Sequence, residues 1–261
     1  MPSAATLRLK IEHALENRFP SALTPILQTI PDVASSGIAV VDSLLRGGIP
    51  VGAISELVGC SSSGRTSLAL SIVAQRTKVE QVCAWVDVDD TFDPESAAAS
   101  GVRLDHLLWI RCHNRSPRDY PTKSSSSRNS QWTRLDQSLR SIDLLLQAGG
   151  FAAIVLDLGN IAPEHGRRIP LATWFRFRQA ADHARCSLVL LGRAAYAQSS
   201  SALVLECSPS RAITAGGTVL RGFTFDIQQQ RRRFTHGVNS IRKPSASTWS
   251  AGAQWEAEMR V

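Results

Sequence analysis

The chain has no long apolar run and no closely paired cysteines. None of its segments reaches the ~18 consecutive apolar residues that a membrane-spanning helix needs, so no transmembrane helix is expected. The N-terminus lacks the basic-then-apolar pattern of a secretory signal. The five cysteines are scattered without any C-x-x-C spacing, which argues for a reducing compartment and against structural zinc. We therefore expect a cytoplasmic protein that does not engage a membrane.

Positive charge is concentrated in two segments of this 261-residue chain, whose formal net charge is +7. Residues 111–134 carry six Lys or Arg against one Asp, and residues 231–261 carry six against two Glu. Such segments attract nucleic acid or acidic protein surfaces without sequence readout, unless they are only solvated linkers. We expect an N-terminal helix and linker over 1–35, a core over 36–230 with a flexible basic insertion near 114–131, and a disordered basic tail from residue 231.

A glycine- and serine-rich loop is the most specific local motif. It has the spacing of the phosphate-binding loop G-x-x-x-x-G-K-[S/T], with arginine in the place of lysine. An apolar strand pattern (53–58) precedes it and an apolar helix pattern (67–78) follows it. In such a loop, glycines let successive backbone N–H groups face one concavity, and the following helix adds its dipole. The candidate ATP-binding residues are Gly59, Ser61, Ser62, Ser63, Gly64, Arg65, Thr66 and Ser67.

The arginine substitution bears on catalysis. Arg65 keeps the positive charge of the expected lysine, but its guanidinium is planar and bulkier than an ammonium. We expect the backbone cradle to survive, with the Thr66 hydroxyl on Mg²⁺, and ATP hydrolysis to suffer. A Ser/Gly-rich turn that binds nothing is the alternative.

Strands alternate with helices between residues 53 and 191. This order predicts an α/β fold with a mainly parallel sheet and helices on both faces. Two further strand patterns, at 202–207 and 218–228, predict an antiparallel edge near the C-terminus. The apolar run 151–156 ends at Asp157, as expected of a buried parallel strand with an acid at its C-terminal tip.

Three segments together resemble the RecA family over roughly residues 36–230. They are residues 36–52 with Gly47-Gly48-Ile49-Pro50, the loop 59–67, and 87–94 with its Asp93-Pro94. Within that superfamily the chain is most similar to the ImuA-type proteins, on Gly64-Arg65-Thr66-Ser67, the strands 84–87 and 151–157, and residues 167–176. This resemblance implies a RecA-like accessory of damage-induced translesion synthesis. Its implied partners are a translesion polymerase-like protein, RecA and single-stranded DNA.

The resemblance also places candidate catalytic and metal residues. RecA-type ATPases hold a water-activating glutamate where Asp89 stands, and aspartate is one methylene shorter. Asp90 is an alternative base, and a helix cap or turn is the structural alternative for both. Asp157, at a strand end near the loop, could hold Mg²⁺ through water, unless backbone amides satisfy it.

Basic residues are the candidates for contact with DNA or a partner. They are Arg193 after the strand 187–191, Arg167 and Arg168 in the loop 158–170, and Arg231, Arg232 and Arg233 at the start of the expected tail. The connection from Gly192 to Ser201 is short, with Tyr196 its sole aromatic, which argues against strand exchange. Trp249 and Trp255 are expected to be unburied in the tail, where they could anchor a partner.

Three functions remain open from the sequence. The first is an ImuA-type accessory with weak or absent ATPase activity. The second is an active ATP-dependent recombinase that binds single-stranded DNA. The third is another P-loop NTPase or a small-molecule kinase.

Overall fold

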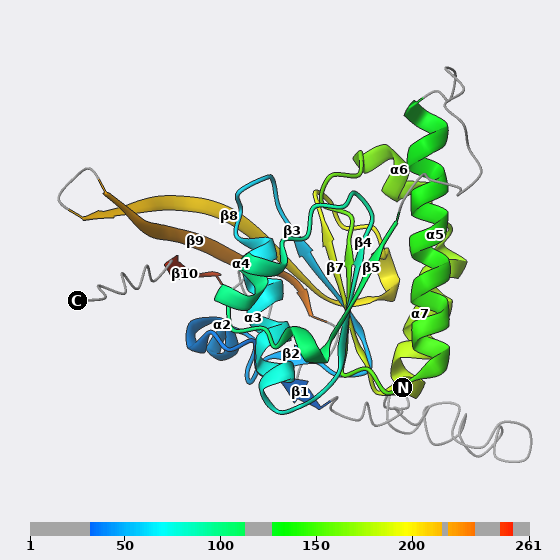
Figure 1. Cartoon of the computed structure of the whole chain (residues 1–261), viewed down its shortest axis with the longest axis horizontal. Helices are drawn as coiled ribbons and strands as arrows, with labels where there is room; N and C mark the ends of the chain where they lie inside the picture. Colours follow the sequence, from blue (N-terminus) through cyan, green and yellow to red (C-terminus); the bar gives the residue numbers. More distant parts are fainter. Residues whose placement is uncertain (1–31, 113–126, 216–218, 233–245, 253–261) are drawn as a thin grey trace, which may run out of the picture. The chain divides into compact units, whose positions relative to one another are not determined.

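The computed structural model describes residues 32–112, 127–215, 219–232 and 246–252 (Figure 1). The expected N-terminal helix and Trp255 lie outside these residues. Ten strands are present in the described part. They are β1 (Val33–Ala34), β2 (Ile49–Pro50), β3 (Ile54–Val58), β4 (Cys83–Asp87), β5 (Leu107–Arg111), β6 (Ala153–Asp157), β7 (Ser187–Gly192), β8 (Ser201–Ala215), β9 (Val219–Arg232) and β10 (Ala246–Gly252).

Helices connect most of these strands. They are α2 (Ala39–Leu44), α3 (Arg65–Lys78), α4 (Pro94–Ala99), the 3-10 turn η1 (Leu104–His106), α5 (Ser127–Ala148), α6 (Pro163–Arg167), α7 (Leu171–Ala184) and the 3-10 turn η2 (Gln198–Ser200). Among the described residues, no helix combines the length and the apolar character that crossing a bilayer requires.

Eight of the strands form one sheet in the order β10-β9-β8-β3-β7-β6-β4-β5. The strands from β8 to β5 in this order are parallel, whereas β9 and β10 are antiparallel to their neighbours. β1 and β2 form a separate antiparallel pair. The expected α/β fold, mainly parallel with antiparallel strands at the C-terminal edge, is confirmed.

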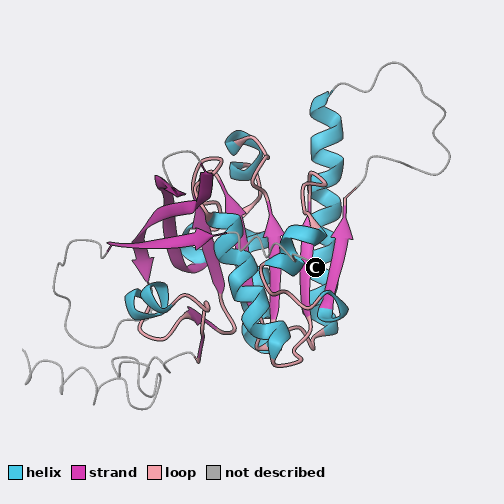
Figure 2. Ribbon diagram, turned by 60° about the vertical axis from the view of Figure 1, so that its left-hand side comes forward, coloured by secondary structure: helices cyan, strands magenta, loops and turns pink. Residues whose placement is uncertain are grey.

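Alternate residues of the central strands feed two separate hydrophobic cores. On β4, Trp85 belongs to the core that α3 covers, and Ala84 belongs to the core that α5 and α7 cover. On β6, Val155 belongs to the core that α3 covers, and Ile154 belongs to the core that α5 and α7 cover. This follows from the period of two along a strand, which sends neighbouring side chains to opposite faces. The helices accordingly lie on both sides of the sheet (Figures 1 and 2).

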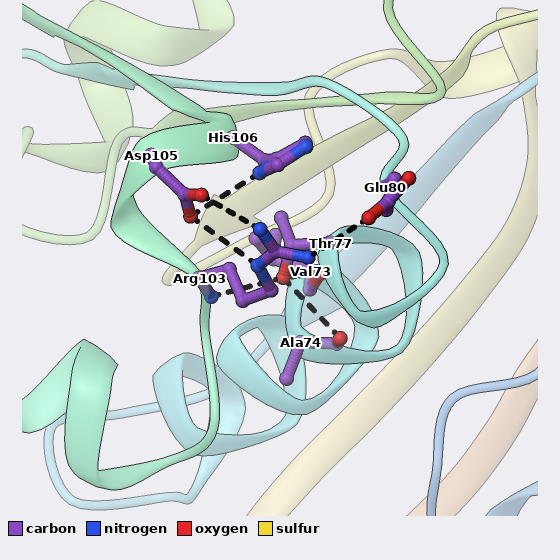
Figure 3. A network of polar contacts seen from close by, with 7 residues as sticks. All are labelled: Val73, Ala74, Thr77, Glu80, Arg103, Asp105 and His106. Atoms are coloured by element: carbon purple, nitrogen blue, oxygen red, sulfur yellow. Dashed lines mark hydrogen bonds and ion pairs between the residues drawn. The ribbon is translucent and has the colours of Figure 1, made fainter.

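A polar network joins the end of α3 to the segment before β5 (Figure 3). The buried Thr77 hydroxyl donates to carbonyls of the preceding helical turn and accepts from the backbone N–H of Arg103, at 3.1 Å. The Arg103 guanidinium pairs with Asp105 at 2.7 Å and with Glu80 at 3.5 Å. His106 lies 3.2 Å from Asp105. The network fixes the C-terminal end of α3, whose N-terminus follows the glycine-rich loop.

Two expectations about flexible segments differ from the structure. α5 begins at Ser127, so the end of the expected insertion is helical, while residues 113–126 lie outside the described part. β9 runs to Arg232, and β10 pairs with it inside the expected tail. Trp249 of β10 is only 5% exposed, so its expected lack of burial is wrong. The β10 sequence, rich in Ala, Ser and Gly, has no apolar alternation, and only pairing with β9 makes it a strand.

Candidate functional site

The glycine-rich loop connects β3 to α3. Gly64 is the N-cap of α3 and has φ 84°, a left-handed conformation that glycine adopts without strain. A Cβ at this position would also lie 2.6 Å from Cγ of Phe225 on β9. Backbone conformation and close packing therefore both require glycine here. The loop is tied to the sheet by a hydrogen bond from the Gly59 N–H to the Gly192 carbonyl, at 3.0 Å.

A cavity of about 310 Å³ lies at this loop. It is lined by Cys60, Ser62, Ser63, Gly64, Arg65, Thr66, Ser67, Phe223 and Phe225. The first N–H groups of a helix have no acceptor within that helix, and they favour anions. The Ser63 hydroxyl, which has no hydrogen-bond partner, is buried against Gly59 and does not face the cavity. The cavity thus offers unpaired donors to an anionic group such as a phosphate. Of the predicted loop residues, only Gly59 and Ser61 do not line it.

The guanidinium of Arg65 is engaged by backbone carbonyls. Arg65 is only 7% exposed. Its Nη1 donates to the Gly59, Cys60 and Gly192 carbonyls, the last two at 3.2 and 3.4 Å, and its Nη2 donates to the Gly159 carbonyl at 3.1 Å. Burial lowers the pKa of this arginine, and nearby Arg193 adds to that effect, while Asp157 opposes it. Arg65 therefore joins the loop to the ends of two neighbouring strands.

Asp157 ends β6 next to this arginine. Its Oδ1 accepts from the Gly159 N–H at 2.8 Å. A Cβ on Gly159 would lie 2.6 Å from Arg65 Nη2 and 2.9 Å from Asp157 Oδ1, so a larger residue would displace one of the two side chains. Burial raises the pKa of Asp157 to about 6; the Asp87 and Asp89 charges also raise it, whereas the Gly159 N–H and Arg65 lower it.

The raised pKa of Asp157 predicts a pH dependence of stability. A carboxyl whose pKa rises from 3.8 to about 6 on folding binds its proton more tightly in the folded state, so its contribution to stability declines as pH rises from about 4 to 6. Asp157→Asn should lack this decline and raise the free energy of unfolding at pH 7 by about 1–2 kcal/mol relative to wild type. Denaturant unfolding at pH 4 to 8 measures it. A variant with an unchanged slope would contradict the burial of this carboxylate.

The other acids at this edge of the sheet are already paired. Asp87 accepts from the N–H groups of Thr91 and Phe92, at 3.1 and 2.8 Å, and so caps the turn after β4. The predicted base Asp89 forms an ion pair with Arg134 of α5, at 2.8 Å. Burial raises the pKa of Asp89, and Arg134 lowers it.

Asp90, the alternative base, forms a bidentate pair with Arg111, at 2.6 and 2.7 Å. Each carboxylate beyond β4 is thus held by a neighbouring side chain or by the backbone. For Asp89 or Asp90 to act as a base, it would have to leave its arginine partner.

The candidate DNA or partner residues are spread over three places. Arg193 is exposed beside the site and donates to the Gly159 carbonyl at 3.2 Å. Arg167 and Arg168 are exposed at the end of α6. Arg231 and Arg232 belong to β9 rather than to a tail, because they pair with Val204 and Leu203 of β8, and their guanidinium groups donate to the Gln198 and Leu45 carbonyls. Arg233 lies outside the described residues.

The short connection after β7 is held by a buried carboxylate. Glu56 of β3 is 1% exposed, and its Oε2 accepts from the N–H groups of Tyr196 and Ala197, at 2.5 and 3.2 Å. Burial raises the pKa of Glu56, and these two N–H groups lower it. Tyr196 is itself buried, at 2% exposed. Its ring packs within the core and is not presented to solvent.

Sequence reasoning missed four residues of this region. Glu56 sits inside an apolar strand pattern, and Arg134 was counted only as part of a basic segment. Phe223 and Phe225 line the cavity although they lie about 160 residues beyond the loop in the chain. The alternation Phe223-Thr224-Phe225 does indicate two rings on one face of a strand, but not which loop that face covers.

Known proteins resemble the part of the chain that carries the loop. Residues 22–115 match the model of the RecA N-terminal domain. Protein RecA of Pseudomonas fluorescens is 33% identical in strain SBW25 and 42% identical in strain Pf-5, each over 130 residues that make up 50% of this chain and 31% of the relative. Protein RecA of Deinococcus radiodurans is 36% identical over 126 residues, 48% of this chain and 29% of that protein.

The chain therefore spans less than a third of the length of these curated relatives. The mainly parallel sheet with its antiparallel C-terminal edge is consistent with a RecA-like core. The matched segment contains β3, the loop and α3, which position the cavity. Residues 22–115 of this chain are thus similar to the RecA N-terminal domain, and the rest of the chain lies outside that match.

Proposed function

We propose that the chain is a RecA-like protein of the DNA-damage response, an ImuA-type accessory in error-prone translesion DNA synthesis. It binds ATP at the loop and hydrolyses it weakly or not at all. Its partners are a translesion polymerase-like protein and, further, RecA and single-stranded DNA, and it acts in the cytoplasm.

The carbonyl contacts of Arg65 carry this proposal. A phosphate-binding loop needs its cation free to reach the β- and γ-phosphates. Here the guanidinium is buried, donates to four backbone carbonyls and lies beside Asp157. Releasing it toward a phosphate would leave those carbonyls without this donor, which costs free energy. The cradle of N–H groups stays available while the catalytic cation is engaged.

Two further observations support a weak ATPase without strand exchange. Asp89 is paired with Arg134, so a water-activating role would compete with that ion pair. The connection between β7 and β8 is short. Glu56 fixes it by accepting a hydrogen bond from the Tyr196 N–H, and the Tyr196 side chain is buried. Strand exchange needs an exposed aromatic side chain that stacks against spaced bases, and the buried Tyr196 does not provide one.

The loop residues fit a nucleotide with Mg²⁺. The N–H groups at the start of α3 suit phosphate oxygens. The exposed Thr66 hydroxyl would hold Mg²⁺, and Asp157 would hold it through water. Bound Mg²⁺ supplies positive charge against the phosphates and would favour the ionised form of Asp157.

Phosphate release and nucleotide titration test the proposal. We expect little ATP turnover with or without single-stranded DNA. Arg65→Lys should bind ATP about tenfold more tightly, because a compact ammonium on a flexible stem can leave the carbonyls for the phosphates. Arg76→Lys, on the same helix but outside the cavity, is the matched control and should leave affinity unchanged.

Other outcomes favour the alternatives. Vigorous turnover stimulated by single-stranded DNA, with filaments in micrographs, would support a recombinase. Phosphorylation of a metabolite would support a kinase. An affinity for ATP that Arg65→Lys leaves unchanged would mean that the cavity is not the nucleotide site.

A further inference from the structure

Two phenylalanine rings of β9 form one wall of the loop cavity. Phe223 and Phe225 are two residues apart on one strand, so they share a face, and their ring centroids are 6.2 Å apart. Both line the cavity together with the loop residues. No loop residue supplies an aromatic surface, so β9 provides the only rings among the residues lining this cavity.

The two rings differ in what covers them. Phe225 is 6% exposed, packs against Gly64 and contacts Trp249 of β10 in a tilted arrangement, with centroids 4.9 Å apart. Phe225 and Trp249 are directly opposed in the β9–β10 register, so they form a cross-strand aromatic pair. Phe223 is 46% exposed, although it borders the same cavity. The buried pair thus holds the strand in place, and the Phe223 ring is left half open to solvent.

The cavity therefore joins two chemically different parts. At the start of α3 it has N–H groups, which suit an anion. On the β9 side it has a flat apolar ring, which suits a second ring through offset or edge-to-face contact. Its volume of about 310 Å³ lies at the lower end of small-molecule sites. A free phosphate would satisfy the first part and leave the second unused.

We propose that Phe223 is the base-contacting residue of this site, stacking on the nucleobase of a nucleoside di- or triphosphate whose phosphates the loop holds. This inference rests on the proposed nucleotide binding and adds to it a preference for a base. Phe225 and Trp249 act as positioning residues that hold β9 against the loop. The ligand class is then a nucleotide, rather than any polyphosphate.

Competition titrations separate the base contact from phosphate binding. The probe is a fluorescent etheno-adenosine triphosphate, and the competitors are ATP and inorganic tripolyphosphate. For the full chain, we expect ATP to compete at least tenfold better than tripolyphosphate. Phe223→Ala should weaken ATP binding about tenfold and leave tripolyphosphate binding unchanged, the range expected for losing one stacked base.

Matched variants identify stacking as the cause. Phe223→Tyr keeps the ring and should retain affinity, whereas Phe223→Leu keeps apolar area without a flat face and should resemble Phe223→Ala. Leu220→Ala, an exposed apolar residue of β9 outside the cavity lining, should bind as wild type. Circular dichroism checks that each variant is folded.

The remaining outcomes overturn the proposal. If ATP and tripolyphosphate bind equally and Phe223→Ala changes neither, the base contact is wrong while phosphate binding stands. If Phe223→Ala tightens ATP binding, the ring obstructs the site instead of stacking in it. If the full chain binds neither compound, both this inference and the proposed nucleotide binding fail.

Discussion

Arg65→Ala is expected to lower the free energy of unfolding by about 3–5 kcal/mol. The guanidinium donates to the carbonyls of Gly59 and Cys60 in the loop, of Gly159 just after β6 and of Gly192 at the end of β7, and so holds these segments together. Removing it takes one donor from each of these carbonyls, although Gly192 keeps the Gly59 N–H and Gly159 keeps Arg193, and it also removes the positive charge beside the partly buried Asp157 carboxylate. Chemical denaturation at pH 7 measures the loss.

Arg193→Ala is the matched control for this measurement. Arg193 donates to the same Gly159 carbonyl but is exposed, so its removal should change the free energy of unfolding by about 0.5 kcal/mol or less. Arg65→Lys should fall between wild type and Arg65→Ala, because an ammonium reaches fewer carbonyls than a guanidinium. A loss below about 1 kcal/mol for Arg65→Ala would mean that the arginine does not join the loop to β6 and β7 in solution.

Glu56→Ala is expected to lower the free energy of unfolding by about 2–4 kcal/mol. Glu56 is buried in the central strand β3, and its carboxylate accepts from the Tyr196 and Ala197 N–H groups. Alanine would leave both donors unsatisfied and would open a cavity below the connection between β7 and β8. Amide hydrogen exchange should show faster exchange at residues 196 and 197 in this variant.

Glu56→Gln separates the hydrogen bonds from the charge. The amide oxygen can still accept from both N–H groups, so stability at pH 7 should stay within about 1 kcal/mol of wild type. Because burial raises the pKa of Glu56 in the folded state, its contribution to stability declines as pH rises above the usual glutamic acid range. The glutamine variant should lack that part of the decline. If Glu56→Ala and Glu56→Gln are equally unstable, the two accepted hydrogen bonds are not what the side chain contributes.

Local patterns predicted most of the ordered core. The strand pattern 53–58 and the helix pattern 67–78 match β3 and α3 to within two residues at each end, because alternating or helical apolar spacing decides which backbone buries its side chains. The segment 246–252 was beyond such reasoning. Its only large apolar residue is Trp249, whose burial depends on Phe225 of the neighbouring strand.

The candidate site could also be predicted only in part from local sequence patterns. The loop spacing indicated a phosphate cradle, since glycine positions and a following helix are local requirements. The direction of the Arg65 guanidinium is not decided locally, because its acceptors Gly159 and Gly192 lie 94 and 127 residues away in the chain. The same holds for Asp89, whose partner Arg134 is on α5.

The amino-acid sequence by itself determined the class of fold, the alternation of strands and helices between residues 53 and 191, and the presence of a loop with phosphate-binding spacing, because each depends on residues close together in the chain. Tertiary structure alone decided which groups surround that loop: the carbonyls that hold Arg65, the acid beside it, and the two phenylalanines of β9. These contacts arise only when parallel strands bring their ends to one edge of the sheet and an antiparallel strand folds back over it.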